Sequence, residues 1–123
     1  MITEDYVSFE VAKLLKEKGF NEKCIATYNL ATGTFKVEEV YQDWTTRWKV
    51  YVSAPTLQMT MKWLREVHNL HIIIECGYGN RLMYFSNIKN ALTNDSLPND
   101  TGYYSTYEQA CEATIKYCLE NLI

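Results

Sequence analysis

Two pairs of strand-like segments are each joined by a few turn residues, and this feature limits the fold more than any other. The first pair, 24–30 and 34–41, flanks a short loop that ends at Gly33. The second pair, 70–76 and 81–85, flanks a turn rich in glycine. Strands joined by so short a turn run antiparallel, because a parallel pair needs a long crossover connection. The alternation of apolar and polar residues slips at Val40-Tyr41, so the register there stays open.

Two amphipathic segments lie before and between these hairpins. The first follows Ser8, a candidate N-cap, and ends before Gly19, which suits the left-handed conformation that closes a helix. The second starts at Ala54-Pro55, where proline favours a first helical turn, and ends at Asn69. Both place an apolar stripe on one side and charged residues on the other, which predicts helices packed on a sheet.

A third helix is predicted at the C-terminal end of the chain. The residues Ser105-Thr106-Tyr107-Glu108 fit a capping box in which Ser105 is the N-cap and Glu108 reaches back. The polar stretch 86–102 before it contains several asparagines, a proline and a glycine, and we expect a long loop there.

The order of these segments predicts an α+β fold. Alternation over 48–53 suggests one more strand, in which Trp48 and Val50 would pack under the helices. We therefore expect an antiparallel sheet of four to five strands, packed on one face by three helices. The chain has 123 residues, a length typical of one domain, so a single domain over residues 1–123 is expected.

Net charge and hydropathy narrow the classes of partner. The formal net charge is −3, whereas proteins that bind nucleic acid through its phosphates usually have a basic excess. The longest purely apolar run is Ile72-Ile73-Ile74, far short of the roughly 18 residues of a membrane helix. The acidic start, Met1-Ile2-Thr3-Glu4-Asp5, lacks the features of a signal peptide. We expect a cytoplasmic protein with no membrane partner.

Metal and catalytic chemistry have weak support in the sequence. His68 and His71 form an H-x-x-H pair, but the pair spans a helix end and a strand start, so the two rings lose a common face. The cysteines form no C-x-x-C pair and are read as small apolar side chains of a reducing compartment; they are Cys24, Cys76, Cys111 and Cys118. No nucleophile or paired carboxylates stand in a known catalytic pattern. We predict no metal, no cofactor and no enzymatic activity.

Aromatic and cationic side chains alternate in one short segment, and this cluster is the best candidate for a partner-binding site. Its members are Trp44, Arg47, Trp48, Lys49 and Tyr51. Trp, Tyr and Arg are enriched in protein-interaction hot spots, and aromatics beside cations also stack on single-stranded nucleic acid. A purely structural reading is a strand in which Arg47, Lys49 and Tyr51 face water.

Three blocks of sequence bear a resemblance to known proteins. They lie within residues 4–20, 53–69 and 104–123. Two of the stretches that carry the resemblance are Glu4-Asp5-Tyr6-Val7-Ser8-Phe9-Glu10 and Tyr117-Cys118-Leu119-Glu120-Asn121-Leu122-Ile123. Together they resemble a family of small uncharacterised proteins of Bacteroides-group gut bacteria, their prophages and other mobile elements. That family has no assigned activity, so the resemblance implies an intracellular accessory protein and no catalytic residue.

These observations favour a small accessory or adaptor protein that binds another protein, or a second copy of itself. The alternative is a nucleic-acid-binding module that uses the segment Trp44–Tyr51, which the negative net charge disfavours.

Overall fold

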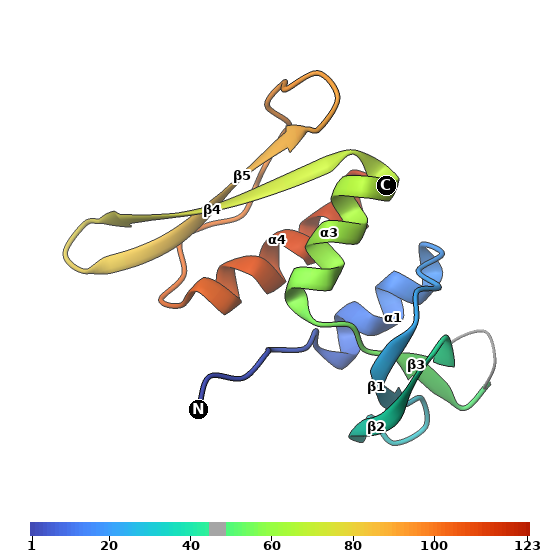
Figure 1. Cartoon of the computed structure of the whole chain (residues 1–123). Coiled ribbons are helices and arrows are strands. Elements are labelled where there is room, and N and C mark those ends of the chain that lie inside the picture. Colours follow the sequence, from blue (N-terminus) through green and yellow to red (C-terminus); the bar gives the residue numbers. More distant parts are fainter. Residues whose placement is uncertain (45–48) are drawn as a thin grey trace. The chain divides into compact units, whose positions relative to one another are not determined.

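Within the described residues, helices and strands follow one another in the predicted order, one helix, three strands, a helix, two strands and a helix (Figure 1). The structure is a computed structural model that describes residues 1–44 and 49–123. In chain order the elements are α1 (Phe9–Glu17), β1 (Cys24–Asn29), β2 (Phe35–Gln42), β3 (Tyr51–Ser53), α3 (Leu57–His68), β4 (Leu70–Tyr78), β5 (Leu82–Asn90) and α4 (Tyr107–Asn121). The fold is therefore α+β, as predicted.

The described strands form two antiparallel sheets, not the single sheet that was predicted. One sheet has the order β2-β1-β3 and the other consists of β4 and β5. The chain divides accordingly into an N-terminal unit, Met1–Thr56, and a C-terminal unit, Leu57–Ile123. β3 pairs with β1, so the first hairpin completes its sheet with a strand close to it in sequence. That the whole chain forms a single domain stays a prediction.

Helix α1 begins and ends where the sequence predicts. The side chain of Ser8 accepts a hydrogen bond from the N–H of Val11 at 3.2 Å, which confirms the N-cap. Gly19 has a φ of 87°, and the N–H of Phe20 returns to the carbonyl of Leu15 at 2.9 Å. Val11 and Leu15 are buried, so the apolar stripe of the helix forms part of the core of the N-terminal unit.

An aromatic cluster fixes the first hairpin. The ring of Tyr28 in β1 lies between Phe9 and Phe35, with ring centroids 5.4 Å and 5.2 Å away, and its hydroxyl donates to the carbonyl of Val7 at 2.7 Å. Gly33 has a φ of 72°, and a Cβ there would lie 3.3 Å from the ring of Phe9. The hairpin loop thus requires glycine both for its backbone and for the space that Phe9 fills.

The third strand is shorter than the predicted segment 48–53. β3 starts at Tyr51, and Val52 is buried at 1% exposure while Val50 is 57% exposed. The expectation that Val50 packs under the helices is wrong, because Val50 lies before the first residue of β3 at the end of the sheet, where its carbonyl accepts the N–H of Leu30 at 2.9 Å but its side chain is exposed. Trp48 lies outside the described residues.

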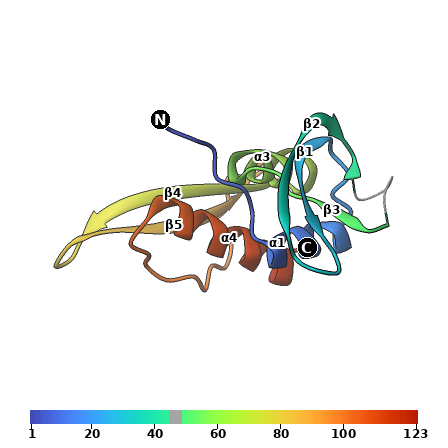
Figure 2. The same ribbon diagram turned by 90° about the horizontal axis from the view of Figure 1, so that it is seen from below.

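The C-terminal unit is a long hairpin covered by two helices. β4 pairs with β5 without a break from Leu70 opposite Asn90 to Tyr78 opposite Leu82. Helices α3 and α4 pack on this hairpin and on each other, and Figure 2 shows the same unit turned by 90°. Ile72 and Ile88, which are cross-strand partners, are both buried.

Strand β5 extends into the stretch 86–102 that was predicted to be a loop. It continues to Asn90, with Ser86 and Ile88 buried. The amide of Asn87 donates to the carboxylate of Glu75 on the neighbouring strand at 2.6 Å, so a turn-forming residue serves here as a cross-strand partner.

Two helix starts differ from the prediction by one or two residues. Helix α3 begins at Leu57, after Pro55, whose carbonyl accepts the N–H of Val7 at 3.0 Å and holds the chain extended. In α4 the N-cap is Thr106, which accepts from the N–H of Gln109 at 3.1 Å. Ser105, the predicted cap, instead donates to the Gln109 side chain.

Asn69 ends helix α3 as predicted, with a φ of 57°. Its carbonyl accepts the N–H of Ala91 at 2.7 Å, so the residue that turns the chain from α3 into β4 is also bonded to the end of β5.

Candidate functional site

Strand β2 loses its regular pairing with β1 after its first three residues. Ala26 pairs with Val37, and Cys24 pairs with Gln42. Between these two pairs, β1 contains one residue, Ile25, whereas β2 contains four, Glu38–Tyr41. This is a large β-bulge, and it lies where the sequence alternation slips. Bulges bend a strand and redirect its side chains, so the second half of β2 does not continue the flat edge.

Trp44 folds back from the end of β2 onto the sheet. Its indole N–H donates to the carbonyl of Cys24 at 2.7 Å, and its backbone N–H donates to Oγ of Ser53 at 3.1 Å. The ring of Tyr51 meets it edge-on at a centroid distance of 6.1 Å. Trp44 is 7% exposed, so it belongs to the core of the N-terminal unit.

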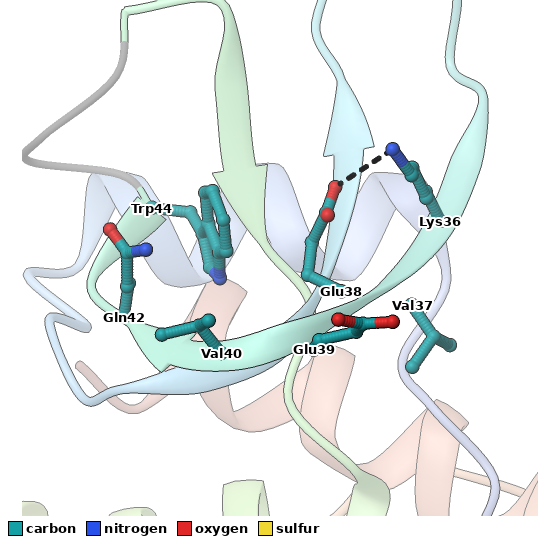
Figure 3. Close-up of a pocket in the computed structure, with 7 residues that line it drawn as sticks. All are labelled: Lys36, Val37, Glu38, Glu39, Val40, Gln42 and Trp44. Carbon is teal, nitrogen blue, oxygen red and sulfur yellow. Dashed lines mark ion pairs between the residues drawn. The ribbon is translucent and has the colours of Figure 1, made fainter.

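A pocket of about 390 Å³ lies between this tryptophan and the bulge (Figure 3). Its lining consists of Lys36, Val37, Glu38, Glu39, Val40, Gln42 and Trp44. In Figure 3 the Trp44 ring and the Glu38 side chain stand on opposite sides of it, with Val40 below. Lys36 and Glu38 form an ion pair of 3.6 Å at one side. The pocket is large enough for one long side chain.

The backbone of β2 presents free polar groups at the edge of its sheet. The carbonyl of Ala26 in β1 accepts the N–H of Ala54 at 2.9 Å, so the polar groups of Ala26 point toward β3. Val37, its partner in β2, therefore directs its N–H and C=O away from β1. The same holds for Phe35, which faces Tyr28. Since β2 is an edge strand among the described residues, these groups face outward from the sheet.

Several large apolar side chains of β2 are exposed. They are Phe35 at 40%, Val37 at 50%, Val40 at 55% and Tyr41 at 61%. Edge strands of native proteins are usually protected by charge or bulges, and β2 has both in its second half. Apolar exposure remains over its length, which is typical of a surface that another chain covers.

The predicted site residues that the structure describes differ in burial. Trp44 and Tyr51 lie together, with Trp44 buried and Tyr51 half-buried, so their rings form part of the core. Lys49 is exposed. Arg47 and Trp48 lie outside the described residues.

Sequence reasoning missed the part of β2 from Lys36 to Gln42. The signal that points to it is the slip at Val40-Tyr41 in an otherwise alternating strand. A slip of this kind marks an extra residue or more in one strand, and bulges are over-represented beside functional sites.

Three of the four cysteine thiols are buried. Burial, with the nearby charges of Asp43 and Glu22, raises the pKa of Cys24 to about 12. Burial likewise raises the pKa of Cys111 to about 11 and that of Cys118 to about 12. Cys76 in β4 is exposed.

Neither histidine has a metal-binding environment in the described part of the chain. Within residues 1–44 and 49–123, no three His, Cys, Asp or Glu side chains are grouped closely enough to hold a metal ion. The ring of His68 packs edge-on against Trp63 at 4.7 Å. Nε2 of His68 and Nδ1 of His71 are buried without a hydrogen-bond partner.

None of the helices described combines the length and hydropathy needed to cross a membrane. Comparison with protein-family models, with curated proteins and with solved structures found no match.

Proposed function

We propose that this protein is a small accessory or adaptor protein that binds another protein by adding one of its partner's strands to β2. The observation that carries the proposal is an edge strand with outward N–H and C=O groups at Phe35 and Val37 and exposed apolar side chains on the same strand. Strand addition uses these two features together, since the backbone groups give affinity and the alternate side chains give specificity.

The exposed side chains support a protein partner of apolar character. The ring of Phe35 already packs against the rings of Tyr6 and Tyr28, with centroid distances of 5.3 Å and 5.2 Å. Because the side chain is already ordered, its contact with a partner costs little further conformational entropy. Val37, Val40 and Tyr41 are each at least half exposed and would be covered by an added segment. Covering such area is the main source of affinity in protein association.

The biological setting of this proposal is a bacterial or phage accessory protein, as the family resemblance implies. An adaptor of this kind has no reaction of its own and acts by bringing a partner to a place or holding it in a state. The cytoplasm, where the sequence predicts it, is part of the same proposal.

The test is an affinity pull-down of the tagged protein from a lysate of its host, with and without nuclease, read by mass spectrometry. Val37→Pro removes one outward N–H and leaves the bonds between β1 and β2 intact, because Val37 does not bond to β1. Val67→Lys changes an exposed apolar residue of α3 and is the control. We expect a stoichiometric partner that survives nuclease, is lost from Val37→Pro and is retained by Val67→Lys.

Two results would contradict the proposal. A partner retained equally by wild type and Val37→Pro, with both folded by circular dichroism, would place binding elsewhere. Partners that disappear with nuclease would instead support the nucleic-acid alternative.

A further inference from the structure

We infer that the segment added to β2 contains a lysine or arginine whose side chain enters the pocket between Trp44 and Glu38. This inference rests on the proposed function, because it specifies the partner of the same edge strand. It commits to an extended protein segment in which a basic residue directly adjoins an apolar one.

The charges that line the pocket favour a cation. Lys36 is opposed by two carboxylates, Glu38 and Glu39, and it already pairs with Glu38 at 3.6 Å. Glu39 makes no ion pair within the described residues.

The uncharged lining suits the rest of a basic side chain. Val40 and the Trp44 ring offer apolar surface to the methylene stem of lysine or arginine, and an indole face also attracts a cation. Gln42, another lining residue, has a buried Oε1 with no hydrogen-bond partner among the described residues. The pocket therefore presents acceptors and apolar surface, with Lys36 as the one cation among its described lining residues.

The alternation of β2 predicts the pattern of the partner. Lys36 pairs with Thr27 while Phe35 and Val37 pair with the residues on either side of Thr27, so Lys36 lies on the opposite face from the two apolar residues. A strand added beside β2 has the same period, and opposite charges facing each other across strands stabilise the pair. Apolar residues should thus line up beside Phe35 and Val37, and the basic residue should be the neighbour of the residue beside Val37 on the side of Glu38, where it faces Glu38 and not Lys36.

The experiment is a selection of displayed random 12-residue peptides on the full-length protein, with counter-selection on Val37→Pro. We expect enriched peptides to contain apolar residues at two alternate positions, with lysine or arginine directly next to one of them. In a synthetic peptide with an enriched sequence, replacing the basic residue by norleucine should weaken binding to the wild-type protein about tenfold. On a Glu38→Gln/Glu39→Gln variant the same replacement should change binding by less than twofold, and Glu120→Gln, which alters an exposed carboxylate of α4, should behave as wild type.

The outcomes separate this inference from the proposed function. Enriched peptides that need the outward N–H of Val37 but show no basic preference would overturn the inference and leave strand addition standing. A norleucine effect of equal size on wild type and on the glutamine variant would also overturn it. No enrichment over Val37→Pro would overturn both.

Discussion

The indole N–H of Trp44 donates a hydrogen bond of 2.7 Å to the carbonyl of Cys24, across a sequence separation of 20 residues. This bond closes the bulged part of β2 onto the sheet and gives the pocket one of its walls. A residue that the sequence marks as a candidate for partner contact therefore acts first as a structural clamp.

Replacing Trp44 by phenylalanine should destabilise the N-terminal unit. The variant leaves the Cys24 carbonyl without its donor, and a buried unsatisfied acceptor costs about 1–3 kcal/mol. The free energy of unfolding, measured with urea, should fall by that amount. Tyr41→Phe, at an exposed position of the same strand, is the control and should change it by less than about 0.5 kcal/mol. Equal effects of the two variants would show that the indole bond is not a clamp.

The thiols should differ sharply in reactivity. Cys76 is exposed, whereas burial raises the pKa of Cys24 and Cys118 to about 12 and that of Cys111 to about 11. Since the thiolate is the reactive form, we expect one fast thiol per folded chain with a disulfide reagent near neutral pH, and four after unfolding. Cys76→Ser should abolish the fast phase; a second fast thiol in that variant would contradict the burial of the others.

Stability should decline in alkali because of the buried thiols. The pKa of Cys118 is raised from 9.0 to about 12, so between these values the folded chain keeps a proton that the unfolded chain loses. The free energy of unfolding therefore falls as pH rises above 9, by up to about 1.4 kcal/mol per pH unit for each such group. Cys118→Ala should flatten this slope in urea titrations at several pH values.

The two neighbouring residues before α4 give a matched test of its cap. Thr106 accepts the N–H of Gln109, while Ser105 contacts only the Gln109 side chain among the bonds described. Thr106→Ala should lower the melting temperature by an amount that corresponds to about 1 kcal/mol, and Ser105→Ala by much less. A larger effect of Ser105→Ala would restore the capping box that the sequence predicts.

A buried polar contact couples β5 to α4. Oγ1 of Thr114 and Oγ of Ser86 lie 2.7 Å apart, and both residues are buried. A double-mutant cycle of Ser86→Ala and Thr114→Val should give a coupling energy of at least about 0.5 kcal/mol. The pair Thr93→Ala and Thr114→Val, in which Thr93 is exposed, should be additive. Additivity in both cycles would contradict the coupling.

Local signals explain which parts of the fold the sequence predicts well. Ser8, Gly19, Gly33 and Asn69 act through their own backbone or the next turn, so their roles are readable from neighbouring residues. The sequence predicts the cap of α4 one residue early, because Ser105 and Thr106 are chemically alike and both reach Gln109.

Longer-range effects explain what was missed. Asn87 is typical of loops, yet it lies in a strand because Glu75 on the facing strand accepts its amide proton. The division into two sheets depends on which strand pairs with which, and alternation within a strand does not contain that information.

The candidate site shows the same limit. The aromatic and basic residues near Trp44 attract attention in a sequence, but the burial of Trp44 depends on the carbonyl of Cys24, 20 residues away. The exposed apolar edge of β2 is visible only when β1 is seen to pair with both β2 and β3, which leaves β2 with β1 as its single neighbour among the described strands.

The bulge in β2 also bears on how far the sheet can grow. Regular pairing with β1 covers Phe35 to Val37 before the four residues of the bulge interrupt it. Fibril-forming segments need about six or seven residues in continuous register. An edge with three regular residues can accept a short guest strand but is a poor template for stacking copy upon copy. The same irregularity that shapes the pocket thus guards the protein against amyloid assembly.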